Sequence, residues 1–373
     1  MSFPVHLSDA AVEEFGREVD AIRDEVMESR GERDRRYLLR LIRLQRRLAL
    51  GGRLVMLASL ACLPRWGHAL AGWQWFVPVM ALGTVMLALA KILENMEIGH
   101  NIMHGQWDWM RDPDIHSATW EWDTVCPSDQ WKHSHNVVHH AWTNVIGKDR
   151  DVGYGMLRVT EQQRWHPAYL VQPIAAFLLM APLFEWFIAL HDLELNRLRA
   201  GKRSFADIRP MLAGIGRKVA RQGLKDYVLW PLLAGPFFLY VLAANVVANV
   251  IRNLWSFVII FCGHFPEGAH YFRKEDVEDE TRARWYVRQL LGSCNIDGGR
   301  LFHVVSGNLS HQIEHHLFPD MPSNRYPEVA PRVRALCARF GLPYNTSSLG
   351  RQFGTTIGKI FRLALPAAAP SPA

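Results

Sequence analysis

The chain has 373 residues, a formal net charge of +6 and a mean hydropathy of −0.05, and its apolar residues lie in long blocks. Its five cysteines are scattered without a CxxC pair, which excludes a disulfide framework and a thiolate-bound zinc or iron–sulfur site. There is no GxGxxG nucleotide-binding loop, so we expect any electrons that a redox reaction needs to come from another protein. We expect the protein to associate with a lipid bilayer, and we do not expect it to bind nucleic acid.

Residues 1–47 are predicted to be helical and cytoplasmic, and no secretory signal is visible in them. They carry ten arginines, and the stretch from Arg33 to Arg47 has the pattern of a basic amphipathic helix. We interpret this stretch as a helix that lies on the membrane surface, in preference to one that binds a partner protein.

Four apolar stretches predict two membrane-crossing hairpins. The first hairpin pairs Leu48 to Leu63 with Leu70 to Ala90 through a short connection that contains a proline. The second spans Tyr227 to Gly263, 37 residues in which Arg252 is the only charge. This length is too great for one crossing, and Gly235-Pro236 offers a place to turn.

A further apolar run, from Pro167 to Phe184, is predicted to lie in the membrane interface or to re-enter it without crossing. Residues 191–225 carry nine Lys and Arg against three acids, so this segment and the N-terminal region should both be cytoplasmic. All histidine-rich segments then face the cytoplasm and can share one site. The predicted organisation is a cytoplasmic region of residues 1–47, a membrane domain of residues 48–350 and a tail of residues 351–373, with both termini cytoplasmic.

Three short clusters contain eight of the 17 histidines, and their spacing predicts metal ligation. The clusters are His100 and His104; His135, His139 and His140; and His311, His315 and His316. On a helix, residues i, i+4 and i+5 project from nearly the same side, so each cluster can direct several imidazoles at one place. Eight or nine imidazoles exceed what one ion can bind, which implies two metals or a surplus. His264, at the end of the fourth predicted span, is a further candidate ligand.

The residues alone leave two alternatives open. His311, Glu314 and His315 match HxxEH, the inverted zinc-protease signature in which the glutamate acts as general base. That hypothesis leaves the other two histidine clusters unexplained. Asp149 and Asp151 either cap a loop rich in turn-forming residues or hold an imidazole in one tautomer from outside the ligand set.

The sequence around these clusters resembles the membrane-bound fatty-acid desaturases, and within them the bacterial acyl-CoA (stearoyl-CoA) Δ9 desaturases. The resemblance covers about residues 20–350 and is carried by Glu94 to Trp109, His135 to Tyr154 and Gly307 to Asp320. It implies an all-α integral membrane protein with four transmembrane helices in two hairpins. A cytoplasmic helical cap would carry the three histidine boxes, residues 100–104, 135–140 and 311–316.

The resemblance also implies a centre of two iron ions. The histidines that would hold them are His100, His104, His135, His139, His140, His264, His315 and His316, with His311 or Gln312 completing the third box. In animal relatives an asparagine one helical turn before the fourth-span histidine reaches a metal-bound water, and here that position is Ile260. Asn308 or Gln312 would therefore serve as an auxiliary or water-mediated ligand, and Asp149, Asp151 and Glu314 would lie just outside the ligands.

The implied reaction is the O2-dependent introduction of a cis double bond, at position 9, into a long saturated acyl chain carried by coenzyme A or a lipid. Reducing equivalents from NAD(P)H would arrive through a flavin or iron–sulfur reductase or a ferredoxin. The same site would suit an acyl-chain or alkane hydroxylase. The predicted location is the inner or plasma membrane, with the active site on the cytoplasmic side.

Overall fold

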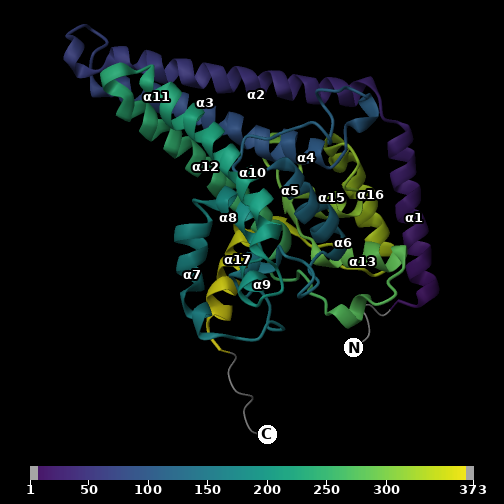
Figure 1. Cartoon of the computed structure of the whole chain (residues 1–373). Coiled ribbons are helices and arrows are strands. Elements are labelled where there is room, and N and C mark those ends of the chain that lie inside the picture. The colour runs from purple at the N-terminus through teal and green to yellow at the C-terminus, as the bar shows by residue number, and fades with distance from the viewer. Residues whose placement is uncertain (1–6, 367–373) are drawn as a thin grey trace.

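Helices α1 to α17 follow one another along residues 7–366, the part of the chain that the computed structural model describes (Figure 1). Their bounds are α1 Asp9–Glu28, α2 Glu32–Ser59, α3 Trp73–Leu93, α4 His100–Met103, α5 Ser128–Lys132, α6 His140–Trp142, α7 Gln172–Ile174, α8 Phe184–His191, α9 Leu195–Arg199, α10 Phe205–Gly223, α11 Trp230–Leu232, α12 Phe238–His264, α13 Arg282–Gly292, α14 Arg300–Val305, α15 Gln312–Leu317, α16 Tyr326–Arg339 and α17 Leu349–Ala364. Segments of π-helix are η3 Glu94–Gly99, η5 His133–His139, η8 Ala175–Met180 and η9 Leu224–Leu229.

The prediction of an all-α chain needs one small correction. Strand β1, Asn295–Asp297, pairs in parallel with strand β2, Thr346–Ser348. This short ladder ties the segment before α14 to the start of α17. The predicted tail, residues 351–373, begins inside α17, which packs against α12 and α7, and residues 367–373 lie outside the described part of the chain.

The basic stretch from Arg33 to Arg47 and the apolar stretch that follows it form one helix. Helix α2 runs unbroken for 28 residues, about 42 Å at the α-helical rise. Asp34 near its start accepts the backbone N–H of Gly31 and so satisfies one donor of the first turn. The stretch from Arg33 to Arg47 is therefore not a separate helix, because nothing turns the chain between its basic and apolar halves. Its position on the membrane surface stays a prediction.

Two hairpins of long helices pack together as a bundle, at the upper left of Figure 1. Helices α2 and α3 form the first hairpin, and their backbones approach closely: a Cβ atom on Gly52 would lie 2.7 Å from the carbonyl oxygen of Gly83. In the second, α10, η9 and α11 lead to a turn at Gly235 (φ 54°), after which α12 runs back along α3. Both turns lie where the hydropathy pattern predicts them.

Within the described residues, two helical stretches are long and apolar enough to cross a membrane. They are Trp73–Met103 and Gly235–His264. A third candidate is the pair Pro167–Met180 and Phe184–His191, which is bent by 113° and suits a broken span or a re-entrant loop. Large apolar side chains on these segments are exposed, among them Leu82, Val246 and Leu178. Exposed apolar surface of this extent is typical of contact with lipid.

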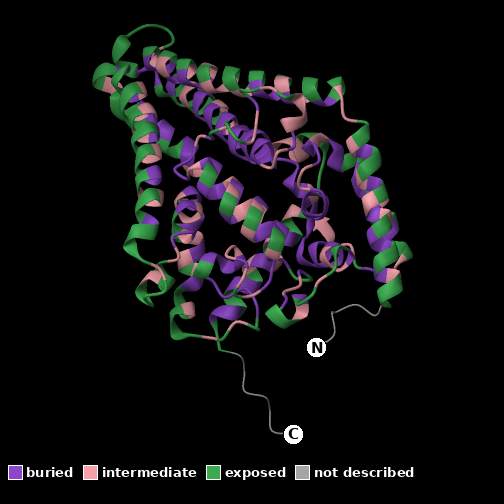
Figure 2. Cartoon of the chain, turned by 45° about the vertical axis from the view of Figure 1, so that its right-hand side comes forward, coloured by how far each residue is buried: buried purple, intermediate pink, exposed green. Residues whose placement is uncertain are grey.

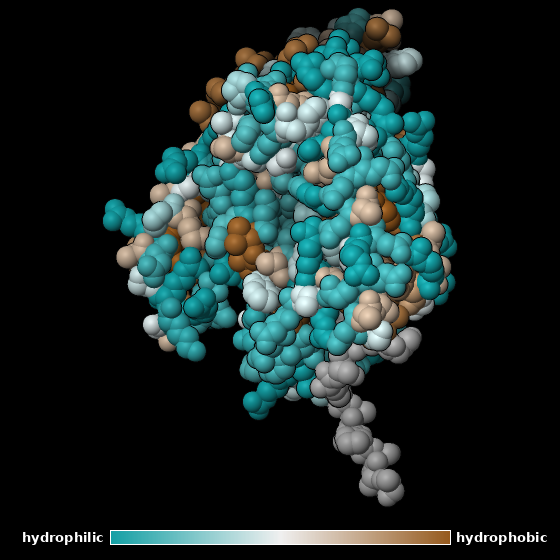
Figure 3. All heavy atoms as spheres, turned by 90° about the vertical axis from the view of Figure 1, so that its right-hand side faces the viewer, coloured by the Kyte–Doolittle hydropathy of each residue, from teal (hydrophilic) through white to brown (hydrophobic). Residues whose placement is uncertain are grey.

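Polar surface covers the opposite side of the molecule. Figure 3 shows a mostly hydrophilic face over the body of the protein, with hydrophobic side chains gathered along its upper edge, where the bundle lies. In Figure 2 the buried residues concentrate where the bundle meets the body, and the outer helices α1 and α2 alternate buried and exposed residues. The protein thus has an apolar bundle at one end and a polar helical body at the other.

Buried charges join the two hairpins. Asp226 on η9 accepts hydrogen bonds from Arg53 on α2 and from Lys91 on α3, each at 2.6 Å. Lys91 also donates to Asp123 at 3.1 Å. Asp226 is fully buried and both of its partners are nearly so. Because each charge meets an opposite one, the group is stable only when both hairpins are in register.

Candidate metal centre

Two of the three histidine boxes are built on π-helical turns. In η5 the N–H of His140 bonds to the carbonyl of His135, five residues earlier, and at the end of η3 the N–H of His100 bonds to Asn95. A π-helix needs more than four residues per turn, so residues five apart lie nearly above one another. This winding brings the rings of His135 and His140 to centroids 4.9 Å apart.

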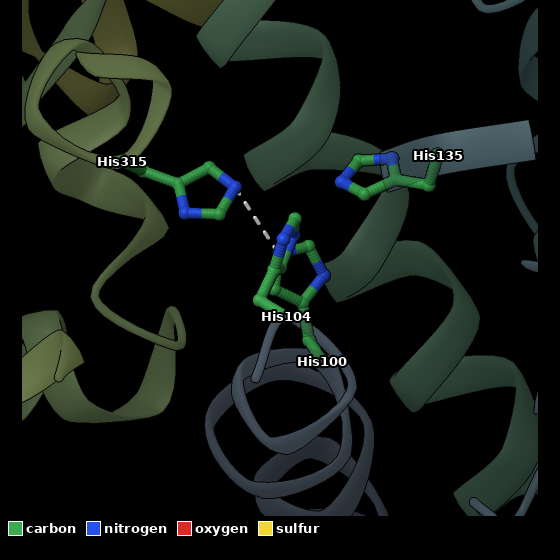
Figure 4. A group of neighbouring side chains, drawn as sticks. All are labelled: His100, His104, His135 and His315. Carbon is green, nitrogen blue, oxygen red and sulfur yellow. Dashed lines mark hydrogen bonds between the residues drawn. The ribbon is translucent and has the colours of Figure 1, made fainter. Parts of the chain in front are cut away.

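Eight histidines from four parts of the chain meet in two adjacent groups. The first group is His100, His104, His135 and His315, with one ring nitrogen from each lying within 4.8 Å of the others. Figure 4 shows these imidazoles converging from the first, second and third boxes, with His100 Nε2 and His315 Nε2 3.3 Å apart.

The second group is His139, His264 and His316. The Nε2 atoms of His264 and His316 lie 3.3 Å apart, and the Gln312 Nε2 lies 2.9 Å from the His264 Nε2. His140 lies within ligand distance of both His315 and His316, so it connects the two groups. Two groups joined by an intervening histidine fit two neighbouring metal ions.

Many of these ring nitrogens are buried and have no hydrogen-bond partner. They are His104 Nε2, His135 Nε2, His139 Nε2, both nitrogens of His140, and His264 Nδ1. A buried polar atom without a partner is costly, and metal coordination would satisfy it. The donor set consists of imidazole nitrogens, which suits iron or zinc and not calcium or magnesium.

Burial keeps His135, His140, His315 and His316 in the neutral form that binds metals, whereas at His139 the charges of Asp149 and Asp151 outweigh burial and raise the pKa. Burial lowers the pKa of His135 to about 4, although hydrogen bonding to Asp151 opposes the shift. Burial and the neighbouring histidines lower the pKa of His140, His315 and His316 well below the ordinary value. These side chains are therefore unprotonated at neutral pH and can act as ligands without losing a proton.

Asp149 and Asp151 lie directly behind the second box. Both carboxylate oxygens of Asp149 are 3.1 Å from His139 Nδ1, and Asp149 also accepts the backbone N–H groups of Asn144 and Asp151. Asp151 lies 3.6 Å from His135 Nδ1 and 3.1 Å from His191 Nε2. Asp149 therefore fulfils both predictions for this loop, since it caps the turn and also holds an imidazole, whereas the Asp151 carboxylate contacts imidazoles.

Two contacts to the clustered histidines, and one contact to Asp151 behind them, come from residues that the motifs did not reveal. Gln289 Oε1 on α13 lies 2.9 Å from His316 Nδ1, and the Tyr326 hydroxyl on α16 lies 3.3 Å from His315 Nδ1. The third is the contact of His191 with Asp151. Gln289, Tyr326 and His191 lie in segments that have no metal-binding pattern of their own. They can therefore be identified only from the way α13, α16 and α8 pack in the structure.

The structure does not bring His311 into either group. Its ring packs on His303, with centroids 4.4 Å apart. The Glu314 carboxylate, 3.9 Å from His311 Nδ1, accepts hydrogen bonds from Asn295 and Tyr344, both at 2.8 Å, and burial raises its pKa to about 7. Because His311 and His315 face different surroundings, the HxxEH zinc-protease site is not assembled.

The two candidate auxiliary ligands are also separated. Gln312 faces His264, as described above, whereas the Asn308 amide donates to Glu97 at 3.0 Å. The Glu97 carboxylate also accepts hydrogen bonds from Tyr37 and Ser323. Asn308 therefore connects the third box to the helix of the first box, and Gln312 is the amide next to the imidazole groups.

A cavity lies beside both histidine groups and extends among the helices of the bundle. His135, His139 and His264 line one part of it, together with aromatic and aliphatic side chains. These walls are Met96, Trp122, Trp131, Tyr154, Phe184, Ile188, Ile260 and Leu309. Asn95, Glu185 and Arg252 line the part that lies among the bundle helices. A mostly apolar chamber beside clustered ligands has the character of a substrate site.

Comparison with known proteins adds an independent result. A family model described as fatty acid desaturase matches residues 72–348, which include all three histidine boxes. The NADPH-dependent stearoyl-CoA 9-desaturase of Mycobacterium tuberculosis is 48% identical over 365 residues, 97% of this chain and 82% of that protein. The sn-1 linoleoyl-lipid 6-desaturase of Synechocystis is 27% identical over 276 residues, 72% of this chain and 75% of that protein. Human fatty acid desaturase 3 is 29% identical over 227 residues, 58% of this chain and 46% of that protein.

Proposed function

Since the chain belongs to the fatty acid desaturase family, we propose that it introduces a cis double bond at position 9 of a long saturated acyl chain carried by coenzyme A. The observation that carries the proposal is the convergence of eight imidazoles, with unpartnered buried nitrogens, beside a mostly apolar cavity. The mycobacterial relative, whose name gives stearoyl-CoA as its substrate, supports position 9 and the acyl carrier.

In this proposal two iron ions bind at the two histidine groups. His100, His104, His135 and His315 hold one ion, His139, His264 and His316 hold the other, and His140 lies between them. When bound, the irons supply the oxidising power that removal of hydrogen from an unactivated methylene requires, with O2 as the co-substrate. The protein's residues orient the ligands and exclude water from the cavity.

Electrons are proposed to come from NADPH through a separate electron-transfer protein. The name of the mycobacterial relative states a dependence on NADPH, and the present sequence has no GxGxxG loop to bind a dinucleotide. A flavin or iron–sulfur reductase, or a ferredoxin, would supply them. This partner is expected to approach the polar body, because the histidine groups lie at the end of the apolar bundle, in contact with α13 and α16 of that body.

The proposed topology is an integral membrane protein with four crossings, formed by α2 with α3 and by α10 to α11 with α12. The bent segment Pro167–His191 would enter the lipid without crossing it. The excess of Lys and Arg in residues 1–47 and 191–225 supports a cytoplasmic location for the body and both termini.

Expression in a host that lacks its own desaturase, with a suitable reductase, tests the proposal. Gas chromatography of total fatty acids should reveal a new cis monoenoic acid with wild type and none with His316→Ala. His311→Ala is the matched control from the same box, and it should retain product because His311 lies outside both groups. No new monoene from wild type, or undiminished product from His316→Ala, would refute the proposal.

Two further readouts of the same cells separate the alternatives. Hydroxy-acyl products detected by mass spectrometry would identify a hydroxylase that uses the same site. Elemental analysis of the purified protein should find two irons per chain, whereas one zinc per chain would favour the protease.

A further inference from the structure

The cavity beside the metal centre has two defined ends. Three elements each contribute one residue near the histidine groups and one residue farther along the bundle. Near the groups are His100, His191 on α8 and His264 on α12. At the far end the same elements present Asn95, Glu185 and Arg252. Along α12 the two ends are twelve residues apart, about 18 Å at the α-helical rise.

Among the three far residues, Arg252 bonds to both of the others. Arg252 Nη2 lies 2.6 Å from Glu185 Oε1, and Arg252 Nη1 donates to Asn95 Oδ1 at 2.8 Å. All three side chains are buried, with Arg252 only 1% exposed. We call this group the polar floor: Asn95, Glu185 and Arg252.

Neighbouring groups hold the polar floor in place. Glu185 also accepts hydrogen bonds from the backbone N–H of Val125 and from Gln222, each at 3.3 Å. Arg252 donates to Asn249 at 3.2 Å and to the Asp123 carbonyl at 3.4 Å. Neither charge can swing aside without becoming buried and unpaired, so the floor is a fixed boundary.

The walls between the two ends are different in character. Ser256 and Ile260 lie along α12 between Arg252 and His264, and Trp131, Phe184 and Ile188 face the same cavity from other elements. Aromatic and aliphatic walls accept methylene groups. A methylene group pressed on the polar floor would contact an ion pair without satisfying any of its hydrogen-bonding atoms, which is unfavourable.

We propose that the polar floor ends the acyl-binding cavity and limits how many carbons extend beyond the bond that reacts. The proposal rests on the desaturase function proposed above. It makes Glu185 and Arg252 determinants of chain-length specificity, and it assigns them no part in the reaction itself. The position of the double bond, counted from the carrier end, should not depend on them.

The test removes both charges together, so that neither is left alone. Cells that lack their own desaturase receive the reductase partner and an equal mixture of saturated fatty acids shorter than, equal to and longer than stearate. Monoenoic products are then quantified by chain length. In the Glu185→Ala/Arg252→Ala double variant, the ratio of longer monoenes to the stearate product should rise roughly tenfold, the usual effect of accommodating an extra methylene. The double bond should stay at its wild-type position.

A second variant works in the opposite direction and keeps the floor intact. Ser256→Leu fills part of the cavity and should shift products toward shorter chains, so the proposal remains testable if the double variant does not accumulate. The matched control is the surface pair Arg362 and Glu161, 2.7 Å apart and outside the cavity. The Glu161→Ala/Arg362→Ala double variant should keep the wild-type profile.

The outcomes separate the two proposals. If wild type makes no monoene, the desaturase function fails. If wild type makes monoenes but Ser256→Leu and the floor variant both keep its chain-length profile, the floor proposal is overturned. A double bond that moves along the chain in the floor variant would also overturn it, because the far end of the cavity would then control placement at the carrier end.

Discussion

Replacing Asp149 by Asn changes a single atom of the carboxylate that holds His139. In the wild type, each carboxylate oxygen faces His139 Nδ1 at 3.1 Å, while Oδ2 accepts the N–H of Asn144 at 2.8 Å and Oδ1 accepts the N–H of Asp151 at 2.9 Å. Whichever way the new amide is oriented, its NH2 group faces one of these two backbone donors. The variant therefore loses one hydrogen bond to a charged acceptor and places two donors in contact.

The expected loss of metal affinity follows from the one hydrogen bond that the variant loses. A hydrogen bond to a charged group contributes about 1.5–3 kcal/mol, which corresponds to roughly 10- to 100-fold in metal affinity and agrees with the usual effect of residues behind metal ligands. We expect Asp149→Asn to bind iron roughly 10- to 100-fold more weakly and to lose desaturase activity in proportion to the iron lost.

The measurement is iron retained per chain in competition with a chelator, together with monoene formed per bound iron. Circular dichroism establishes that the fold is intact. The control is Asp114→Asn, whose side chain is exposed on a loop. Wild-type iron retention and turnover in Asp149→Asn would show that Asp149 serves only the loop, and the reasoning would fail.

Two further predictions concern stability. Burial disfavours ionised Asp34, but hydrogen bonds from Arg325, Asn324 and Gly31 outweigh it and hold the pKa of Asp34 below its ordinary value of 3.8. The stability this group contributes is therefore present above pH 3.8 and is lost as the pH falls through the lower folded-state pKa. Asp34→Asn should cost about 1.5–3 kcal/mol at neutral pH, because it removes the carboxylate that bonds to Arg325 and leaves Glu328, 3.2 Å away, as the remaining acidic partner. It should also remove the acid sensitivity that Asp34 contributes. Thermal unfolding in detergent at several pH values measures both effects, and parallel profiles for variant and wild type would contradict them. Gly307 has a φ of 76°, and a Cβ there would lie 2.6 Å from the Met96 carbonyl oxygen, so Gly307→Ala should lower the free energy of unfolding by about 2 kcal/mol or more. Gly350→Ala should leave the free energy of unfolding unchanged, because a Cβ atom on Gly350 would meet nothing within 4 Å. Equal stability of the two variants would be inconsistent with the turn described at Gly307.

The histidine spacing predicted most of the two histidine groups, because side chains that converge need only a shared direction, which helical periodicity supplies. His100, His104 and the second box were placed together by the three-box pattern alone. The sequence could not reveal the π-helical turn at His133–His139, because no residue type marks it and both windings place several of the imidazoles on one side.

The third box shows a different limit. His311 and Gln312 both fit a helical spacing to His315 and His316, so periodicity could not choose between them. In the structure His311 has non-helical angles (φ −99°, ψ 55°), and α15 begins only at Gln312. The amide is consequently on the ligand side of the helix and His311 is not. The break in the helical backbone at His311 determines which of the two side chains faces the other histidines, and the sequence carries no clear signal for this break.

The long-range partners could not be inferred at all. Gln289 and Tyr326 reach His316 and His315 from α13 and α16, and the polar floor joins residues 95, 185 and 252. Such contacts depend on how remote helices pack. The hairpins were easier to predict, because blocks of apolar residues and a Gly-Pro turn define them locally.

The buried group of Arg53, Lys91 and Asp226 has a consequence for how the protein is made. On the proposed topology, the first hairpin leaves the ribosome and enters the bilayer before residue 226 has been synthesised. Arg53 and Lys91 then lack their acidic partner on η9, and we expect their long side chains to reach toward the lipid headgroups in the meantime. The second hairpin brings the missing carboxylate. Insertion of the last helices would therefore lock the early ones in place, and a nascent chain that stops short of η9 should stay loosely assembled in the membrane.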